Sequence, residues 1–139
     1  MSYQVVYYTR SGFTKRIAEK LAKSLGCDPV QITDGRDWKG FLGFLKAGYY
    51  ASRGKDVEIA VHGPIDPADE LIVVSPLWAG TLTPAVRVFL KGRDARTIRF
   101  VVTSNGSRLE NRAGFRSVTD IVRRLRDEDG VLDAFLKGL

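Results

Sequence analysis

The sequence predicts an α/β fold in which helices cover both faces of a parallel sheet. Three short apolar runs, at residues 4–8, 71–74 and 98–103, have the composition of strands that are buried on both faces. Segments with helical spacing of apolar residues alternate with these runs, and such alternation favours parallel strands joined by right-handed crossovers. Loops containing Ser, Thr, Gly or Asn follow each run, at the strand ends where ligands of parallel sheets bind.

The first strand is expected at Gln4–Tyr8, and a polar turn follows it at residues 9–14. A helix then extends to about Leu25, because apolar residues recur at helical spacing. Pro29–Ile32 has the pattern of a short second strand. Residues 37–54 leave two interpretations open, since their aromatic and Leu residues are spaced as in a helix whereas three glycines weaken that prediction.

In the second half of the chain, Leu71–Val74 is the clearest strand and is expected to be central. Thr83 as the N-cap and Pro84 at the first helical position begin a helix that ends near Gly92. Ile98–Thr103 is expected to form the fourth strand.

The C-terminal part is predicted to contain a further helix that begins near Ser117. The tail from Val131 to Leu139 fits either a fifth strand or a helix, because its apolar residues match both patterns. The strand is preferred, since the alternation of elements requires one.

The length and composition of the chain indicate one domain, residues 1–139, of ordinary globular composition, with 44% hydrophobic and 27% charged residues. A single cysteine, Cys27, fits a reducing cytoplasm. The strand pattern by Tyr3 leaves no room for a signal peptide, and no apolar run approaches the roughly 20 residues that span a bilayer. We therefore expect a cytoplasmic protein without membrane contact.

The net charge of +6 could attract any acidic partner. The densest basic group, Arg123, Arg124 and Arg126, lies on the helix predicted from Ser117, among four acidic residues. We interpret this segment as a solvated helix face of mixed charge. No nucleic-acid-binding motif accompanies the charge, so no nucleic acid partner is expected.

The turn after the first strand has the composition of an anion site. Thr9, Ser11 and Thr14 supply hydroxyls, Gly12 allows close approach of the backbone, and the helix that follows presents unpaired N–H groups at its N-terminus. A plain helix cap is the alternative. The turn lacks the Gly-Lys-Ser/Thr of a Walker loop and the glycines of the dinucleotide fingerprint.

Other catalytic or metal chemistry is not indicated. His62 is the single histidine and has no nucleophile beside it, and no cluster of Cys and His suits zinc. Trp38, Tyr49 and Tyr50 are more typical of core or flap residues than of cofactor contacts.

Three segments resemble the flavodoxin family. Tyr8-Thr-Arg-Ser-Gly-Phe-Thr is similar to the family's phosphate loop, and residues 75–90 are similar to its second flavin loop with the helix after it. Residues 40–55 resemble one branch of flavodoxin-like proteins, so the resemblance covers most of residues 3–107. It implies FMN as cofactor and the strand order 2-1-3-4-5. The family also has a C-terminal helix, which we expect this chain to lack, and a homodimer or another element would then cover the bare face.

The resemblance also implies which residues bind FMN. Phe13 replaces the asparagine that is usual in the phosphate loop. Trp78 would lie near the flavin ring, with a plain core tryptophan as the alternative, and an ordinary turn is the alternative for residues 105–107. The implied set is Thr9, Arg10, Ser11, Gly12, Phe13 and Thr14 for the phosphate, and Pro76, Leu77, Trp78, Ala79, Gly80, Ser104, Asn105, Gly106 and Ser107 for the ring.

The function implied is that of an FMN-dependent electron carrier. The alternatives are an FMN-dependent NAD(P)H:quinone-type reductase, and an interaction module with this fold that no longer binds flavin. Net charge of +6 predicts redox partner proteins with acidic surfaces, and an association that weakens as salt rises.

Overall fold

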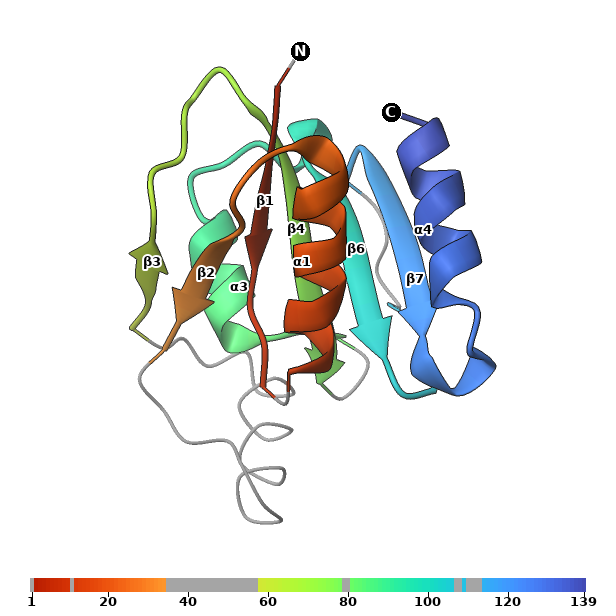
Figure 1. Cartoon of the computed structure of the whole chain (residues 1–139). Helices are drawn as coiled ribbons and strands as arrows, with labels where there is room; N and C mark the ends of the chain where they lie inside the picture. The colour runs from red at the N-terminus through yellow and green to blue at the C-terminus, as the bar shows by residue number, and fades with distance from the viewer. Residues whose placement is uncertain (1, 11, 35–57, 79–80, 107–108, 110–113) are drawn as a thin grey trace.

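A seven-stranded sheet forms the centre of the computed structural model (Figure 1), which describes residues 2–10, 12–34, 58–78, 81–106, 109 and 114–139. Six strands follow the order β3-β2-β1-β4-β6-β7, and β5 pairs with the end of β4. The strands are β1 (Tyr3–Tyr7), β2 (Val30–Thr33), β3 (Ala60–His62), β4 (Glu70–Trp78), β5 (Thr81–Leu82), β6 (Arg99–Ser104) and β7 (Ser117–Val122).

The pairing confirms the predicted fold class. β2, β1, β4, β6 and β7 are parallel neighbours in that order, which is the 2-1-3-4-5 arrangement of flavodoxin-like folds. The order differs at one edge, where β3 adds an antiparallel strand beside β2 that the sequence pattern did not predict. β4 also continues four residues beyond the predicted Leu71–Val74 run, so that Trp78 ends a strand.

Helices cover both faces of this sheet, as predicted. α1 (Phe13–Leu25) and α4 (Glu128–Lys137) lie side by side on one face, and α3 (Pro84–Leu90) lies on the other (Figure 1). Two 3-10 turns, η1 (Ala95–Thr97) and η2 (Arg123–Leu125), complete the described elements. The core therefore has two layers. One packs α1 and α4 on the sheet, and the other packs α3 on the opposite face.

The residues at the ends of α1 and α3 explain where these helices begin and end. Gly12 and Gly26 flank α1 with φ of 95° and 70°, a left-handed conformation that glycine adopts without steric cost. α3 begins as predicted, because the Thr83 hydroxyl accepts a hydrogen bond from the Val86 N–H at 3.4 Å and Pro84 takes the first helical position.

The prediction of a helix that begins near Ser117 is wrong. Residues 117–122 form β7, which pairs with β6 along its whole length. Four of its six residues are β-branched, and such side chains favour a pleated strand over a helix. The fifth parallel strand therefore precedes the tail, and the basic group at 123–126 lies in η2 and the turn after it.

The strand preferred for residues 131–139 is also wrong, because the tail forms α4. Glu128 and Asp129 in its first turn and Lys137 in its last turn complement the helix dipole. Leu132 and Phe135 are buried against the sheet beside α1. The C-terminal helix is therefore present, and it covers the face for which a dimer was expected.

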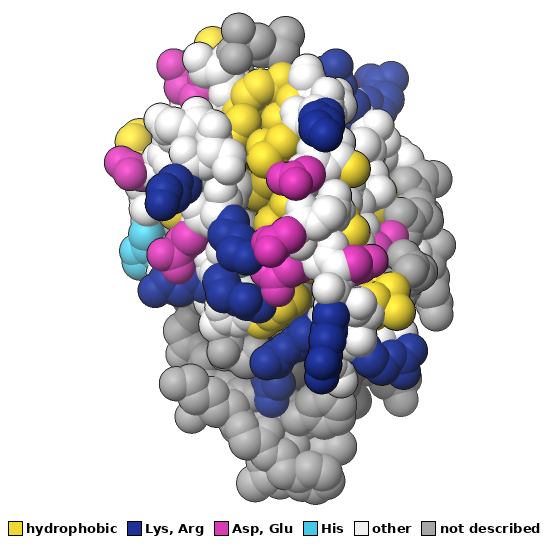
Figure 2. Space-filling view, turned by 45° about the vertical axis from the view of Figure 1, so that its right-hand side comes forward, with side chains coloured by type: hydrophobic (Ala, Val, Ile, Leu, Met, Phe, Trp, Pro, Cys, Tyr) yellow, Lys and Arg dark blue, Asp and Glu magenta, His cyan; other side chains and the backbone are white. Residues whose placement is uncertain are grey.

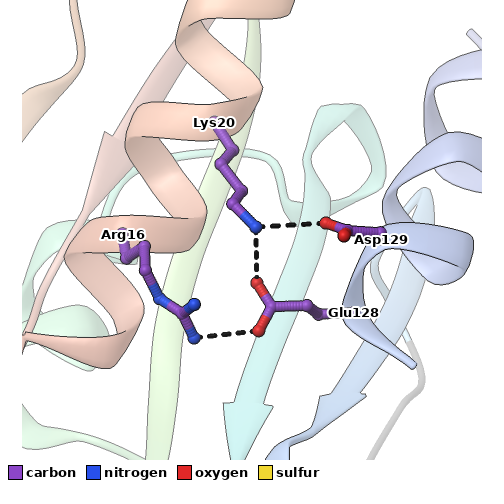
Figure 3. Close-up of polar contacts among 4 residues, drawn as sticks. All are labelled: Arg16, Lys20, Glu128 and Asp129. Carbon is purple, nitrogen blue, oxygen red and sulfur yellow. Dashed lines mark hydrogen bonds and ion pairs between the residues drawn. The ribbon is translucent and has the colours of Figure 1, made fainter. Parts of the chain in front are cut away.

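An ionic cluster joins α4 to α1 (Figure 3). Glu128 bonds Arg16 and Lys20, each at 2.8 Å, and Asp129 bonds Lys20 at 3.1 Å. Both α1 cations point toward α4, so the cluster holds the two helices against each other.

Within the described ranges, no helix is long and apolar enough to cross a membrane. The helix or loop considered for residues 37–54 lies outside the described residues, and so do Trp38, Tyr49 and Tyr50.

Candidate functional site

The carboxyl ends of β1, β4 and β6 meet at one edge of the sheet, at the bottom of Figure 1. Those predicted site residues that the structure describes lie in the last residues of β4 and β6, in the loops after β1 and β6 or at the start of α1, so the parallel topology places them at this edge. Ser11, Ala79, Gly80 and Ser107 lie outside the described residues.

The loop after β1 folds as a tight turn that leads into α1. The Thr9 hydroxyl oxygen accepts a hydrogen bond from the Gly12 N–H at 3.0 Å, and the Gly12 carbonyl accepts one from the Arg16 N–H at 3.1 Å. Among described residues, no side chain caps the helix. Gly12, the cap residue, has no side chain that could accept from the N–H groups of the first turn, which lie at the positive end of the helix dipole.

This donor set fits a phosphate group. A helix of 13 residues supplies the dipole, Gly12 places no side chain over the amides, and the Thr9 hydroxyl keeps its proton for donation because its oxygen accepts the bond from Gly12. A Cβ built at Gly12 would meet nothing within 4 Å. Among the described residues, no atom therefore crowds Gly12 on the side where a side chain would lie.

Thr14 lies differently from the open hydroxyl that the resemblance implied. Its side chain is buried, and its hydroxyl lies 2.7 Å from that of Thr103 at the end of β6. One hydroxyl donates to the other, which leaves one proton for a further acceptor. The pair ties the first turn of α1 to the central sheet, and a role for Thr14 in binding phosphate stays a prediction.

Trp78 forms one wall of the same edge. Its ring is 7% exposed and packs edge-on against Tyr8, with ring centroids 5.7 Å apart and planes at 71°. The Tyr8 hydroxyl in turn donates to Asp34 Oδ2 at 2.7 Å. Trp78 therefore belongs to the core of the α3 face as well as to the candidate site, and sequence reasoning missed the Tyr8 and Asp34 contacts that orient it. Pro76 and Leu77 precede it in β4 and are half-buried.

The loop after β6 lies exposed at this edge. Asn105 and Gly106 are exposed, whereas Ser104 is half-buried at the end of the strand. The Asn105 carbonyl accepts a hydrogen bond from the Arg124 N–H at 3.2 Å. A Cβ at Gly106 would lie 3.4 Å from the guanidinium carbon of Arg124, so η2 borders this loop directly.

Two arginines also flank Phe13, the residue that replaces the family's asparagine. The guanidinium carbons of Arg16 and Arg123 lie 5.2 and 5.3 Å from the centre of its ring, within the range of cation–π attraction. Arg123 was assigned to a solvated helix, and its place at the site was missed. The β-branched composition of residues 117–122 was the signal that could have placed it after a strand.

In the part of the chain that the structure describes, no group of three His, Cys, Asp or Glu side chains could hold a metal ion. The described residues of this edge offer N–H donors, hydroxyls, aromatic rings and arginines.

Comparison with solved structures finds the same fold in flavoproteins. A flavoprotein in complex with FMN from Lactobacillus acidophilus NCFM aligns with a TM-score of 0.64 at 17% identity, covering 93% of this chain and 97% of that one. A proposed flavoprotein from Bacteroides eggerthii DSM 20697 aligns with a TM-score of 0.68 at 18% identity, covering 98% and 96%. Another, from Bacteroides uniformis ATCC 8492, has a TM-score of 0.62 at 15% identity, covering 94% and 97%.

Sequence comparison adds little. A scan against models of protein families finds no match. An aspartate aminotransferase from Thermotoga maritima is 26% identical over 100 residues, which is 72% of this chain but 21% of that protein. The chain thus spans about a fifth of the length of that relative. The fold is therefore that of the flavodoxin-like α/β class, and known flavoproteins share this architecture.

Proposed function

We propose that this chain binds FMN at the carboxyl edge of its sheet and carries electrons between proteins. The observation that carries the proposal is the α1 N-terminus, which has no side-chain cap among the described residues and lies behind the Thr9–Gly12 turn. An open cluster of N–H donors at this point of a parallel sheet suits a phosphate dianion. The FMN-bound protein of the same fold supports the choice of ligand.

FMN would supply the redox chemistry, and the residues at this edge would hold and orient it. The first-turn amides of α1 and the Thr9 hydroxyl would bind the phosphate. Trp78, held edge-on by Tyr8, would form one wall for the flavin ring. The exposed loop at Asn105 and Gly106 would form the other.

An electron carrier needs only a bound flavin and a surface that a second protein can reach, and the proposed FMN site lies at an edge where Asn105 and Gly106 are exposed. Net charge of +6 favours partners with acidic surfaces. A reductase would need in addition a pocket for nicotinamide, and we rank that function second.

Titration of the purified apoprotein with FMN tests the proposal. We expect flavin fluorescence to be quenched at a 1:1 ratio and the flavin absorbance bands to change shape. Riboflavin, which lacks the phosphate, is the matched control, and it should bind at least about tenfold more weakly because the α1 contacts are missing.

Two results would redirect the assignment. A protein that binds riboflavin and FMN equally would contradict the phosphate site, and one that binds neither would be an interaction module with this fold. Steady NAD(P)H oxidation by the flavin-loaded protein with a quinone would indicate the reductase.

A further inference from the structure

The segment Arg123–Arg126, which we call the arginine turn, forms an exposed basic and apolar surface at the carboxyl edge. Its three arginines are exposed, and Leu125 at its centre is 52% exposed. Only one other large apolar side chain among the described residues, Val61, is comparably exposed. Figure 2 shows Lys and Arg side chains gathering toward the bottom of the molecule, where the carboxyl ends of the strands lie.

The arginine turn adjoins two loops of the candidate site. Arg123 lies over the ring of Phe13, the first residue of α1. The Arg124 N–H bonds the Asn105 carbonyl in the loop after β6. A protein that covered this turn would therefore also approach the edge where we place the flavin.

None of the three acidic residues that follow the turn, Asp127, Glu128 and Asp129, forms an ion pair with its arginines. Glu128 is occupied by Arg16 and Lys20, and Asp129 by Lys20. Within the described residues, no carboxylate lies in ion-pair reach of the three arginines. Two of the carboxylates that lie beside the arginines in the sequence are thus engaged by α1 instead.

We propose that the arginine turn is the docking surface for an acidic protein partner, with Leu125 as the apolar contact at its centre. This inference rests on the proposed function, since an electron carrier must bring a partner to the flavin edge. Arginine is enriched in protein interfaces and pairs with carboxylates through two parallel hydrogen bonds. An apolar centre within a charged rim is the usual anatomy of such an interface. Surfaces that bind single-stranded nucleic acid present aromatic rings along a basic groove. The arginine turn is shorter than such a groove and has a leucine at its centre.

Binding to an acidic [2Fe–2S] ferredoxin of the plant type, used as the probe, tests the docking surface. The apoprotein is labelled with ¹⁵N and titrated at low ionic strength. We expect the largest shift changes at residues 105–106 and 123–126. The triple variant Arg123→Gln, Arg124→Gln, Arg126→Gln should bind about tenfold or more weakly, and its affinity should depend less on salt.

Matched controls separate this surface from net charge. The triple variant Lys23→Gln, Lys91→Gln, Lys137→Gln removes the same charge from the C-terminal ends of α1, α3 and α4, at the opposite edge of the sheet. Its affinity should fall by about twofold at most. Leu125→Ser should weaken binding several-fold without changing the salt dependence, and the dispersion of the amide spectra shows that each variant is folded.

Three results would overturn the proposal: no binding of the ferredoxin, equal losses in both triple variants, or shift changes centred away from the arginine turn. Tighter binding of a single-stranded DNA of about 20 nucleotides through the same arginines would assign the surface to nucleic acid instead. The titration uses flavin-free protein. Failure to bind FMN would therefore remove the proposed function while leaving the docking result readable.

Discussion

The hydroxyls of Thr14 and Thr103 lie 2.7 Å apart in the interior, although 89 positions separate them in the chain. Thr14 is the second residue of α1, and Thr103 is near the end of β6. The pair therefore fixes the start of the helix that supplies the candidate phosphate site against the central sheet. It links the stability of the fold to the geometry of the site.

Replacement of one hydroxyl of this pair should destabilise the protein. Thr14→Val leaves the Thr103 hydroxyl buried without its partner, and we expect a loss of about 1–3 kcal/mol. The double variant Thr14→Val, Thr103→Val should cost less than the sum of the two single changes. Urea unfolding measures all three. If Thr14→Val abolished FMN binding and left stability unchanged, Thr14 would be a direct ligand rather than part of the structure.

Gly12→Ala should weaken FMN binding, whereas Gly26→Ala should not. Both glycines have positive φ, and among the described residues no atom lies within 4 Å of a Cβ built at either one, so each change should cost about 1–2 kcal/mol in stability. Only Gly12 lies at the candidate phosphate site, and its Cβ would shift the turn that presents the amides. We expect an affinity loss of about tenfold for Gly12→Ala, measured by fluorescence titration. Equal affinities in the two variants would contradict the site.

Glu128→Gln should loosen α4 from α1, because it removes the negative charge that pairs with both Arg16 and Lys20 and replaces one acceptor oxygen with a donor. The pairs are partly exposed, so we expect a loss of about 1 kcal/mol in total. Asp133→Asn, an exposed position on the same helix, is the control and should change stability little.

The cluster also predicts a dependence on pH. Hydrogen bonds from Lys20 to Glu128 and Asp129 raise the pKa of Lys20 above its usual 10.5. A raised pKa in the folded state means that this stabilisation is complete below pH 10.5 and is lost as pH rises through the folded value. Thermal unfolding between neutral and strongly alkaline pH should show a smaller alkaline loss in Glu128→Gln than in the original protein.

The burial of Tyr7 adds a second contribution to the loss of stability at alkaline pH. Desolvation, with a smaller effect of the Glu19 charge, raises the pKa of Tyr7 above 10.0. The neutral phenol is favoured in the folded state, so the stability it contributes falls as pH rises past 10.0. Tyr7→Phe should therefore reduce the alkaline loss of stability, and a pH titration that is unchanged by this variant would contradict the assignment.

The arginines near the site should also act on the flavin potential. Positive charge stabilises the anionic, fully reduced flavin, so a chain of net charge +6 should give a less negative potential than strongly acidic flavodoxins do. Arg123→Gln should shift the potential downward by about 20 mV, which corresponds to about 0.5 kcal/mol. A redox titration of the FMN-loaded protein measures the shift, and Lys137→Gln at the far end of α4 serves as the control.

Much of the fold could be predicted because its signals are local. The apolar runs of β1, β4 and β6, the stripe of α1 and the Thr83-Pro84 start of α3 each depend on residues close together in the chain. The loops of the candidate site followed from the rule that parallel strands end at one edge. The segments assigned to the wrong kind of element lie after residue 113, where Ser117–Val122 and the tail each carry apolar spacings that suit both a strand and a helix. β3 was not predicted at all.

The sequence by itself determined the alternation of strands and helices, and with it the edge at which ligand-binding loops meet. Only the tertiary structure decided that residues 117–122 pair with β6, because a ladder of hydrogen bonds to a distant strand outweighs local helical spacing. The tertiary structure also decided the surroundings of Thr14, Trp78 and Arg123. These depend on contacts with Thr103, Tyr8 and Phe13, and packing across the sheet brings such residues together whatever their separation in the chain.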